Sequence, residues 1–221
     1  MNRRFLSLFS LLLFTALVMA YLWWGKFQYH HGLLLIGTYA GGFALVLGNH
    51  FYHRDGRREM GYRWDNGGKA VRTFGVLTLV FSVLIVLVGI WKSEARIDRW
   101  ADLYVYVGWA ALQQHLLQNF LRLRGEDLFG RGDWRAAFVA AALFGLYHLP
   151  NLPLVAASFS GALLWCLVFM RVPSFMGAWL SHAVLSGCLL LFFKHGLLSQ
   201  FQVGKPGYRY EHYGTGVYVA G

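Results

Sequence analysis

The chain alternates between long apolar runs and short polar blocks that hold nearly all of its charged residues. The runs contain roughly 16 to 21 residues, and about 20 apolar residues in a helix cross the hydrocarbon core of a bilayer. Backbone groups in lipid must be satisfied internally, which favours helices. We therefore predict an all-α, polytopic transmembrane helix bundle of about seven spans, within a range of six to eight: 5–24, 32–52, 74–91, 103–121, 134–149, 154–170 and 174–193.

These runs also define the domain organisation. Residues 1–193 are predicted to form a single transmembrane helical domain, and 194–221 a polar C-terminal tail that is loosely ordered. Residues 18–20 resemble a signal-peptide cleavage site, but the first run is long for a signal peptide, which favours a retained span. The fifth run is predicted to stop at Pro150, because proline cannot continue a helix.

Composition and charge agree with a membrane protein. Only 14% of the residues are charged, against about 25% in soluble proteins. The net charge of +10 lies in the loops, where it acts as a topology signal, so we expect membrane lipids and no nucleic acid as partners. Basic residues gather at the N-terminus, at 54–72 and at 122–135, and this bias predicts a cytoplasmic N-terminus in a multi-pass protein, compatible with a bacterial inner membrane. The loops on the opposite side hold Lys26, Lys92, Arg96 and Arg99.

The fourth run carries the densest group of polar residues within a predicted span. On a helix, Gln114 and Gln118 lie at i,i+4, as do His115 and Asn119, and Gln113 flanks them. This broad polar face is not expected to contact lipid, because polar groups in hydrocarbon need partners. It is either a functional site or a set of hydrogen bonds that join helices.

Two more runs each contain a histidine. His148 follows Phe144 at i+4 in the fifth run, shortly before Asn151. His182 precedes Ser186 at i+4 in the seventh run. Each histidine alone is more often structural than catalytic, but polar groups from three helices describe a site within a bundle. A further pair, His50 and His53, closes the second run and is interpreted as an interfacial polar cap.

In order and spacing, these motifs resemble those of the CPBP family of intramembrane proteases, also called the Abi or type II CAAX prenyl endopeptidase family. The family's Glu-Glu-x-x-x-Arg motif corresponds here to Gln113-Gln114-x-x-x-Gln118, its Phe-x-x-x-His motif to Phe144 and His148, and its His-x-x-x-Asn motif to His182 and Ser186. The resemblance covers the family-like core at 100–193. It implies an intramembrane hydrolase whose catalytic positions fall on Gln113, Gln114, His148 and His182, supported by His115, Gln118, Asn119, Phe144, Asn151 and Ser186.

The departures from the family pattern concern its charged residues. In the family, the first-motif glutamate activates a water, and a glutamine amide cannot accept that proton. Both glutamates and the arginine are replaced by neutral amides, and no aspartate or glutamate falls inside a predicted span. Asp102 lies eleven residues before Gln113, about 16 Å along a helix, too far to act on the same water.

Three functions therefore stay open. The first is a CAAX-protease-like protein that acts on a membrane-embedded or lipophilic substrate, with proteolysis in doubt. The second is a pseudoprotease that binds or chaperones a membrane partner. The third is a histidine-based enzyme acting on a lipid or isoprenoid. No cofactor is expected; if a divalent metal is bound, the predicted ligands are His115, His148 and His182.

Overall fold

The computed structural model describes residues 2–23, 31–92, 100–192 and 203. Every regular element among them is helical, which confirms the all-α class. Because η2 and α5 follow α4 without interruption, the elements form seven helical rods, as the pattern of apolar runs predicts. The elements are α1 (Arg3–Trp23), α2 (His31–His53), α3 (Gly67–Trp91), α4 (Trp100–Gln114), the π-helix η2 (His115–Arg122), α5 (Leu123–Phe129), α6 (Trp134–Leu146), α7 (Leu152–Arg171) and α8 (Phe175–Phe192).

Four of the described helices, α1, α3, α7 and α8, are long and apolar enough to cross a membrane. Helix α6 is apolar but has only 13 residues. It ends at Leu146 rather than at 149, because the backbone tightens into turns before Pro150, with Leu149 N–H donating to Leu146 O. The division into a membrane domain and a tail stays a prediction, since Val203 is the one residue of 194–221 that the structure describes.

The predicted end of the fourth run at residue 121 is wrong. The rod continues through η2 and α5 to Phe129, so Arg122 and Arg124 lie on a helix instead of in a loop. Both arginines are buried and paired with carboxylates, which lets the helix extend past the apolar run. The third run also begins earlier than predicted, at Gly67, where Ala70 is already buried.

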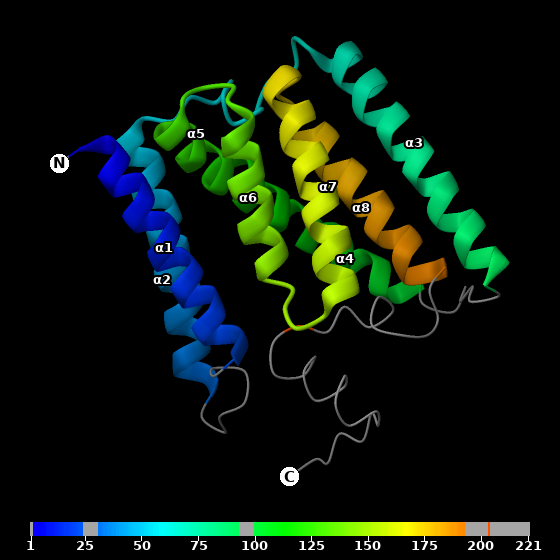
Figure 1. Ribbon diagram of the computed structural model, residues 1–221, viewed down its shortest axis with the longest axis horizontal. Helices are drawn as coiled ribbons and strands as arrows, with labels where there is room; N and C mark the ends of the chain where they lie inside the picture. Colours follow the sequence, from blue (N-terminus) through cyan, green and yellow to red (C-terminus); the bar gives the residue numbers. More distant parts are fainter. Residues whose placement is uncertain (1, 24–30, 93–99, 193–202, 204–221) are drawn as a thin grey trace.

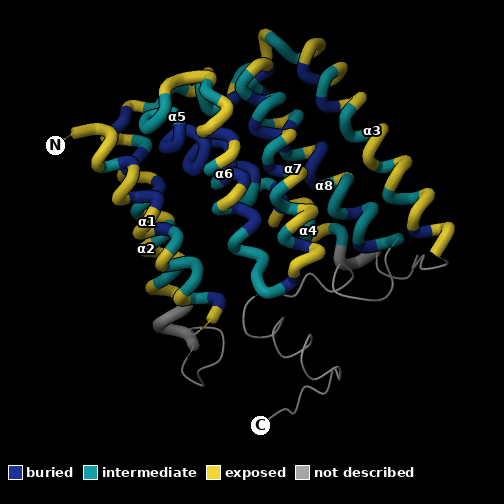
Figure 2. Tube along the Cα trace, viewed as in Figure 1, coloured by how far each residue is buried: buried dark blue, intermediate teal, exposed yellow. Residues whose placement is uncertain are grey.

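Figure 1 shows how the rods are arranged. The α1–α2 pair lies at one side of the molecule and α3 at the other, with α6, α7 and α8 between them. Helix α3 packs on α8, α6 packs on α7, and α1 contacts both α2 and α5. Helix η2 contacts α4, α5, α6 and α7, and the chain around it is the most deeply buried part of the molecule (Figure 2).

Candidate intramembrane site

The polar segment of the fourth run forms a π-helix, η2, in the centre of the bundle. Both predicted i,i+4 pairs are hydrogen-bonded. Gln118 Nε2 donates to Gln114 Oε1 at 3.2 Å, and Asn119 Nδ2 lies 3.2 Å from His115 Nδ1. The pairs serve two separate networks, however, so the polar residues do not act as one face.

The first network joins η2 to α8. Gln114 is completely buried and uses its amide nitrogen to donate to Nδ1 of His182 at 3.2 Å, while its oxygen accepts from Gln118. Since an amide N–H only donates, Nδ1 of His182 is the acceptor, and a neutral imidazole then carries its proton on Nε2. The two glutamines thus fix both the position and the tautomer of His182.

Aromatic rings hold His182 from its other sides. The Trp165 ring lies 4.5 Å from the imidazole centroid, and the Phe144 ring lies at 6.3 Å. Trp165 is itself fixed, because its Nε1 donates to Ser181 Oγ at 3.0 Å. His182 therefore sits in a rigid, mostly apolar wall.

His148 approaches the same wall from the end of α6. Its Nδ1 lies 2.8 Å from the carbonyl oxygen of Phe144, which can only accept, so the proton sits on Nδ1 and Nε2 is an acceptor. The Phe144 ring contacts both histidine rings, with a centroid distance of 5.1 Å to His148. Asn151, also predicted to support the site, caps helix α7 by accepting from Leu154 N–H.

His115 belongs to the second network, which joins η2 to Tyr62 of the α2–α3 connection. Its Nδ1 is 2.9 Å from the hydroxyl of Tyr62, and its ring lies 5.5 Å from the ring of His50. Among the residues that the structure describes, no group of three or more His, Cys, Asp or Glu side chains could hold a metal ion. The predicted ligand set of His115, His148 and His182 is therefore not assembled, because His115 is drawn toward Tyr62 and Asn119.

A cavity of about 960 Å³ opens beside this wall and extends between the α1–α2 pair and helices α6, α7 and α8. Its lining is mainly apolar and aromatic, and no aspartate or glutamate occurs among the described residues that form it. Five of the predicted site residues that line it are polar: Gln113, His115, His148, His182 and Ser186. Phe144 also lines it, whereas Gln114, Gln118, Asn119 and Asn151 lie behind the surface.

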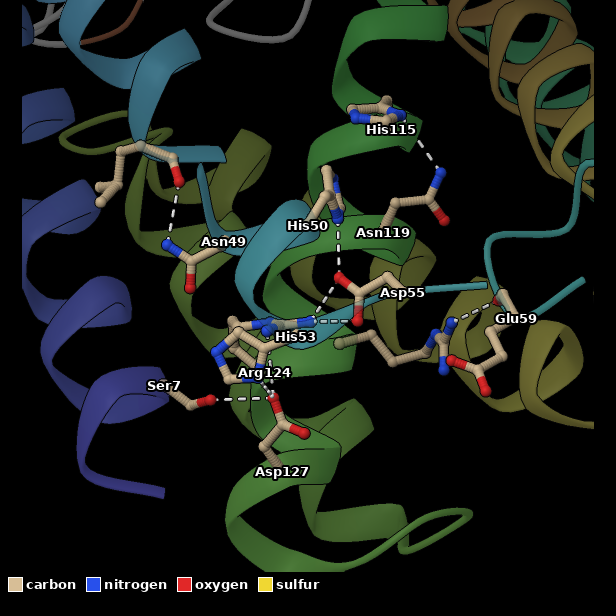
Figure 3. Close-up of polar contacts among 12 residues, drawn as sticks. Ser7, Asn49, His50, His53, Asp55, Glu59, His115, Asn119, Arg124 and Asp127 are labelled. Atoms are coloured by element: carbon tan, nitrogen blue, oxygen red, sulfur yellow. Dashed lines mark hydrogen bonds and ion pairs between the residues drawn. The ribbon is translucent and has the colours of Figure 1, made fainter. Parts of the chain in front are cut away.

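A buried charge network at one end of the bundle was missed by the sequence analysis (Figure 3). Arg124 has no exposed surface, and its Nη2 contacts both carboxylate oxygens of Asp55 at 2.6 to 2.7 Å. Its Nη1 lies 3.2 Å from Asp127, which also accepts from Ser7 at 2.8 Å. The network thereby ties α1 and the α2–α3 connection to α5.

The histidine pair at the end of α2 is part of this network and is more than an interfacial cap. His50 Nδ1 lies 2.7 Å from Asp55, and His53 Nδ1 lies 3.3 Å from Asp127. Burial opposes the ionisation of Asp55, but hydrogen bonds from His50 and Arg124 and the charge of Arg124 outweigh it, so the pKa of Asp55 is lowered. The i,i+3 spacing of Arg124 and Asp127 was the one sequence signal for this cluster.

The comparison with protein families matches residues 99–188, the segment that carries all the site motifs, to the family described as type II CAAX prenyl endopeptidase Rce1-like. This segment is similar to the type II CAAX prenyl endopeptidases, the same family that the site motifs resemble. The resemblance found in the sequence motifs is thereby confirmed, and the Rce1-like segment spans α4 to α8. No curated protein and no solved structure matches the chain.

Proposed function

We propose that this protein admits a membrane-embedded or lipophilic substrate into the large cavity and holds it against His148 and His182. The observation that carries the proposal is the cavity itself: about 960 Å³ of mainly apolar surface, with the polar site residues on its wall. Ligand sites of this size typically combine apolar walls with a few placed polar groups. The four apolar helices and the Rce1-like segment support an integral membrane protein.

Within this proposal, the family's carboxylate-activated peptide hydrolysis does not operate. Gln113 lines the cavity where the family places its base, and its amide cannot take a proton from water. The buried amide chain from Gln118 through Gln114 to His182 replaces a charged network with a neutral one. Such a scaffold suits binding or chaperoning of a membrane partner, as in a pseudoprotease.

The tautomers of His148 and His182 favour a second candidate function, which is histidine-based chemistry on a lipid or isoprenoid. His148 presents Nε2 as a proton acceptor, and His182 carries its proton on Nε2 as a donor. One base and one donor on a cavity wall are the minimal pair for acid–base catalysis. No cofactor is needed for this chemistry, and metal analysis of the purified protein checks that expectation.

Peptide cleavage by reconstituted protein tests whether the family's proteolytic reaction operates here. We expect no cleavage of a prenylated peptide by the wild type and a gain in the triple variant Gln113→Glu, Gln114→Glu, Gln118→Arg, which restores a paired charged network. Cleavage by the wild type at a rate that the triple variant does not raise would contradict the proposal. If the wild type does cleave, loss on His148→Ala or His182→Ala identifies the histidines as its machinery.

We also propose that the N-terminus faces the cytoplasm of a bacterial inner membrane. Arg3, His53 and Asp127 meet at one end of the bundle, so the basic segments gather on one side. That asymmetry supports an inside N-terminus by the positive-inside rule.

A further inference from the structure

A second cavity, of about 610 Å³, lies at the end of the bundle where α2 finishes and α3 and α8 begin. It is separate from the large cavity and is formed by the α2–α3 connection and the first residues of α8. Its lining combines two arginines with aromatic and methionine side chains: Arg57, Tyr62, Arg63, Trp64, Phe175 and Met176.

The connection that forms this cavity is firmly held. Gly61 has a positive φ of 74°, and its carbonyl accepts from Phe175 N–H at 3.0 Å. A Cβ at Gly61 would lie 2.5 Å from the Phe169 ring, so glycine is required for this close approach. Asn66 fastens the far end of the connection by donating to the Pro173 carbonyl at 2.8 Å. The cavity is therefore part of the fold.

The carboxylates of this connection are already engaged. Asp55 pairs with Arg124, Glu59 with Arg131, and Asp65 with Arg63 and, at 3.9 Å, with Arg58. These pairs leave the positive charge of the connection in excess. Arg57, at the cavity, is exposed and has no ion pair among the described residues, as is also true of three neighbouring basic residues: Arg54, Lys69 and Arg72.

The cavity also lies at the depth where a lipid headgroup would sit. The apolar helices α3 and α8 both start beside it, and the Trp64 side chain is 82% exposed, as expected of an aromatic residue at a membrane–water interface. Arginine binds phosphate oxygens in two-pronged geometry, and aromatic and methionine surfaces accept glycerol and acyl groups. A positive, partly apolar cavity at this level fits an anion that carries a lipid tail.

We propose that this cavity binds the phosphate headgroup of an anionic phospholipid, with Arg57 as its main charge partner. Tyr62 connects this lipid site to the large cavity, because its ring lines the lipid site while its hydroxyl contacts His115 at 2.9 Å. A bound lipid therefore lies one hydrogen bond away from the wall of the larger cavity. The inference does not depend on what that larger cavity binds.

The test uses full-length protein in phosphatidylcholine nanodiscs with rising fractions of phosphatidylglycerol, each lipid brominated in turn. The quenching of Trp64 fluorescence, isolated by subtracting a Trp64→Phe variant, reports lipid next to the site. We expect quenching at a lower mole fraction of phosphatidylglycerol than of phosphatidylcholine. Removing one positive charge by Arg57→Gln should raise the phosphatidylglycerol fraction required about five-fold. Arg57→Lys keeps the charge but loses the two-pronged geometry, so it should raise that fraction less than Arg57→Gln does.

The matched control is Arg72→Gln, which removes another exposed charge, from α3 and outside the cavity lining. It should change the required fraction less than two-fold. Equal quenching by both lipids, or equal losses in Arg57→Gln and Arg72→Gln, would overturn the site. Displacement of the bound lipid by free glycerol phosphate would overturn the lipid proposal. It would instead identify the cavity as a site for a water-soluble phosphate compound.

Discussion

Gln114 joins two helices through a single amide group. It accepts from Gln118 and donates to His182, and all three side chains are buried. The side chain of Gln113, the adjacent residue, lines the cavity instead and makes no hydrogen bond with the described part of the chain. Neighbouring glutamines thus have different roles: one positions a histidine, and the other meets whatever enters the cavity.

This difference predicts contrasting effects of the same substitution. Gln114→Leu leaves Nδ1 of His182 without its donor in a buried site, and we expect a loss of about 1–3 kcal/mol in the free energy of unfolding. Gln113→Leu, the matched control, should leave stability unchanged. Thermal unfolding in detergent measures both, and ¹⁵N spectra of the imidazole should show a mixed His182 tautomer only in Gln114→Leu. Equal stability of the two variants would contradict the positioning role.

The sequence predicted which polar residues belong to the site, but it did not predict all of their hydrogen-bond partners. The i,i+4 spacing correctly paired Gln114 with Gln118 and His115 with Asn119, because those contacts lie within one helix. It could not tell that the pairs point to different neighbours, since that depends on how η2 is rotated in the bundle. The contact of His115 with Tyr62, 53 residues earlier, has no local signal.

At the scale of helices, close packing of α3 on α8 depends on a small residue. A Cβ at Gly177 would lie 2.6 Å from the ring of Phe74, a buried residue of α3. Small residues let membrane helices approach in this way. We expect Gly177→Ala to lower the free energy of unfolding by about 1–3 kcal/mol through overpacking.

Gly75 provides the control, because it neighbours Phe74 and a Cβ there meets nothing within 4 Å. Gly75→Ala should be neutral or slightly stabilising, as alanine is the better helix former. Unfolding temperatures in the same detergent compare the two variants. A Gly177→Ala variant as stable as Gly75→Ala would show that α3 and α8 do not pack this tightly.

The buried pair of Arg124 and Asp55 fixes α5 to the α2–α3 connection and predicts a pH dependence. The pKa of Asp55 is lowered in the folded protein, so its stabilisation is complete above the unfolded pKa, about 3.9, and is lost as the pH falls toward the folded value. Asp55→Asn leaves Arg124 partly unpaired and should cost about 3–5 kcal/mol.

Unfolding of detergent-solubilised protein between pH 7 and pH 3 measures this dependence. The wild type should lose stability at the acid end, and the Asp55→Asn profile should be flatter. Asp65→Asn, which removes a solvent-exposed carboxylate from Arg63, should leave the profile near wild type. A wild-type profile as flat as that of Asp55→Asn would exclude this source of stability.

The apolar runs predicted the helical rods because period and length are local properties of the sequence. The charge network was not predicted because its charged members, Asp55, Arg124 and Asp127, lie outside the apolar runs, in segments that look like solvated loops. Only tertiary packing brings Asp55 to Arg124, 69 residues away, and buries both. The π-helical form of η2 likewise had no sequence signal.

At the scale of the whole molecule, the rods line a cavity, and the glutamine and histidine residues of its described lining form one wall. The Rce1-like segment supplies that wall, and the α1–α2 pair contributes to the opposite side of the cavity. The family match covers residues 99–188, so α1 and α2 lie outside it. We propose that a lipophilic molecule occupies this space.

Photo-cross-linking with a long-chain isoprenoid probe in native membranes tests that claim most directly, with labelled residues mapped by mass spectrometry. Ala157 lines the cavity, whereas its neighbour Ala156 is exposed outside the lining, so Ala157→Trp blocks the cavity and Ala156→Trp is the matched control. We predict labelling at cavity residues such as Phe144 and Leu185, lost in Ala157→Trp and kept in Ala156→Trp. Labelling spread over the outer faces of the helices and unchanged by Ala157→Trp would contradict the account.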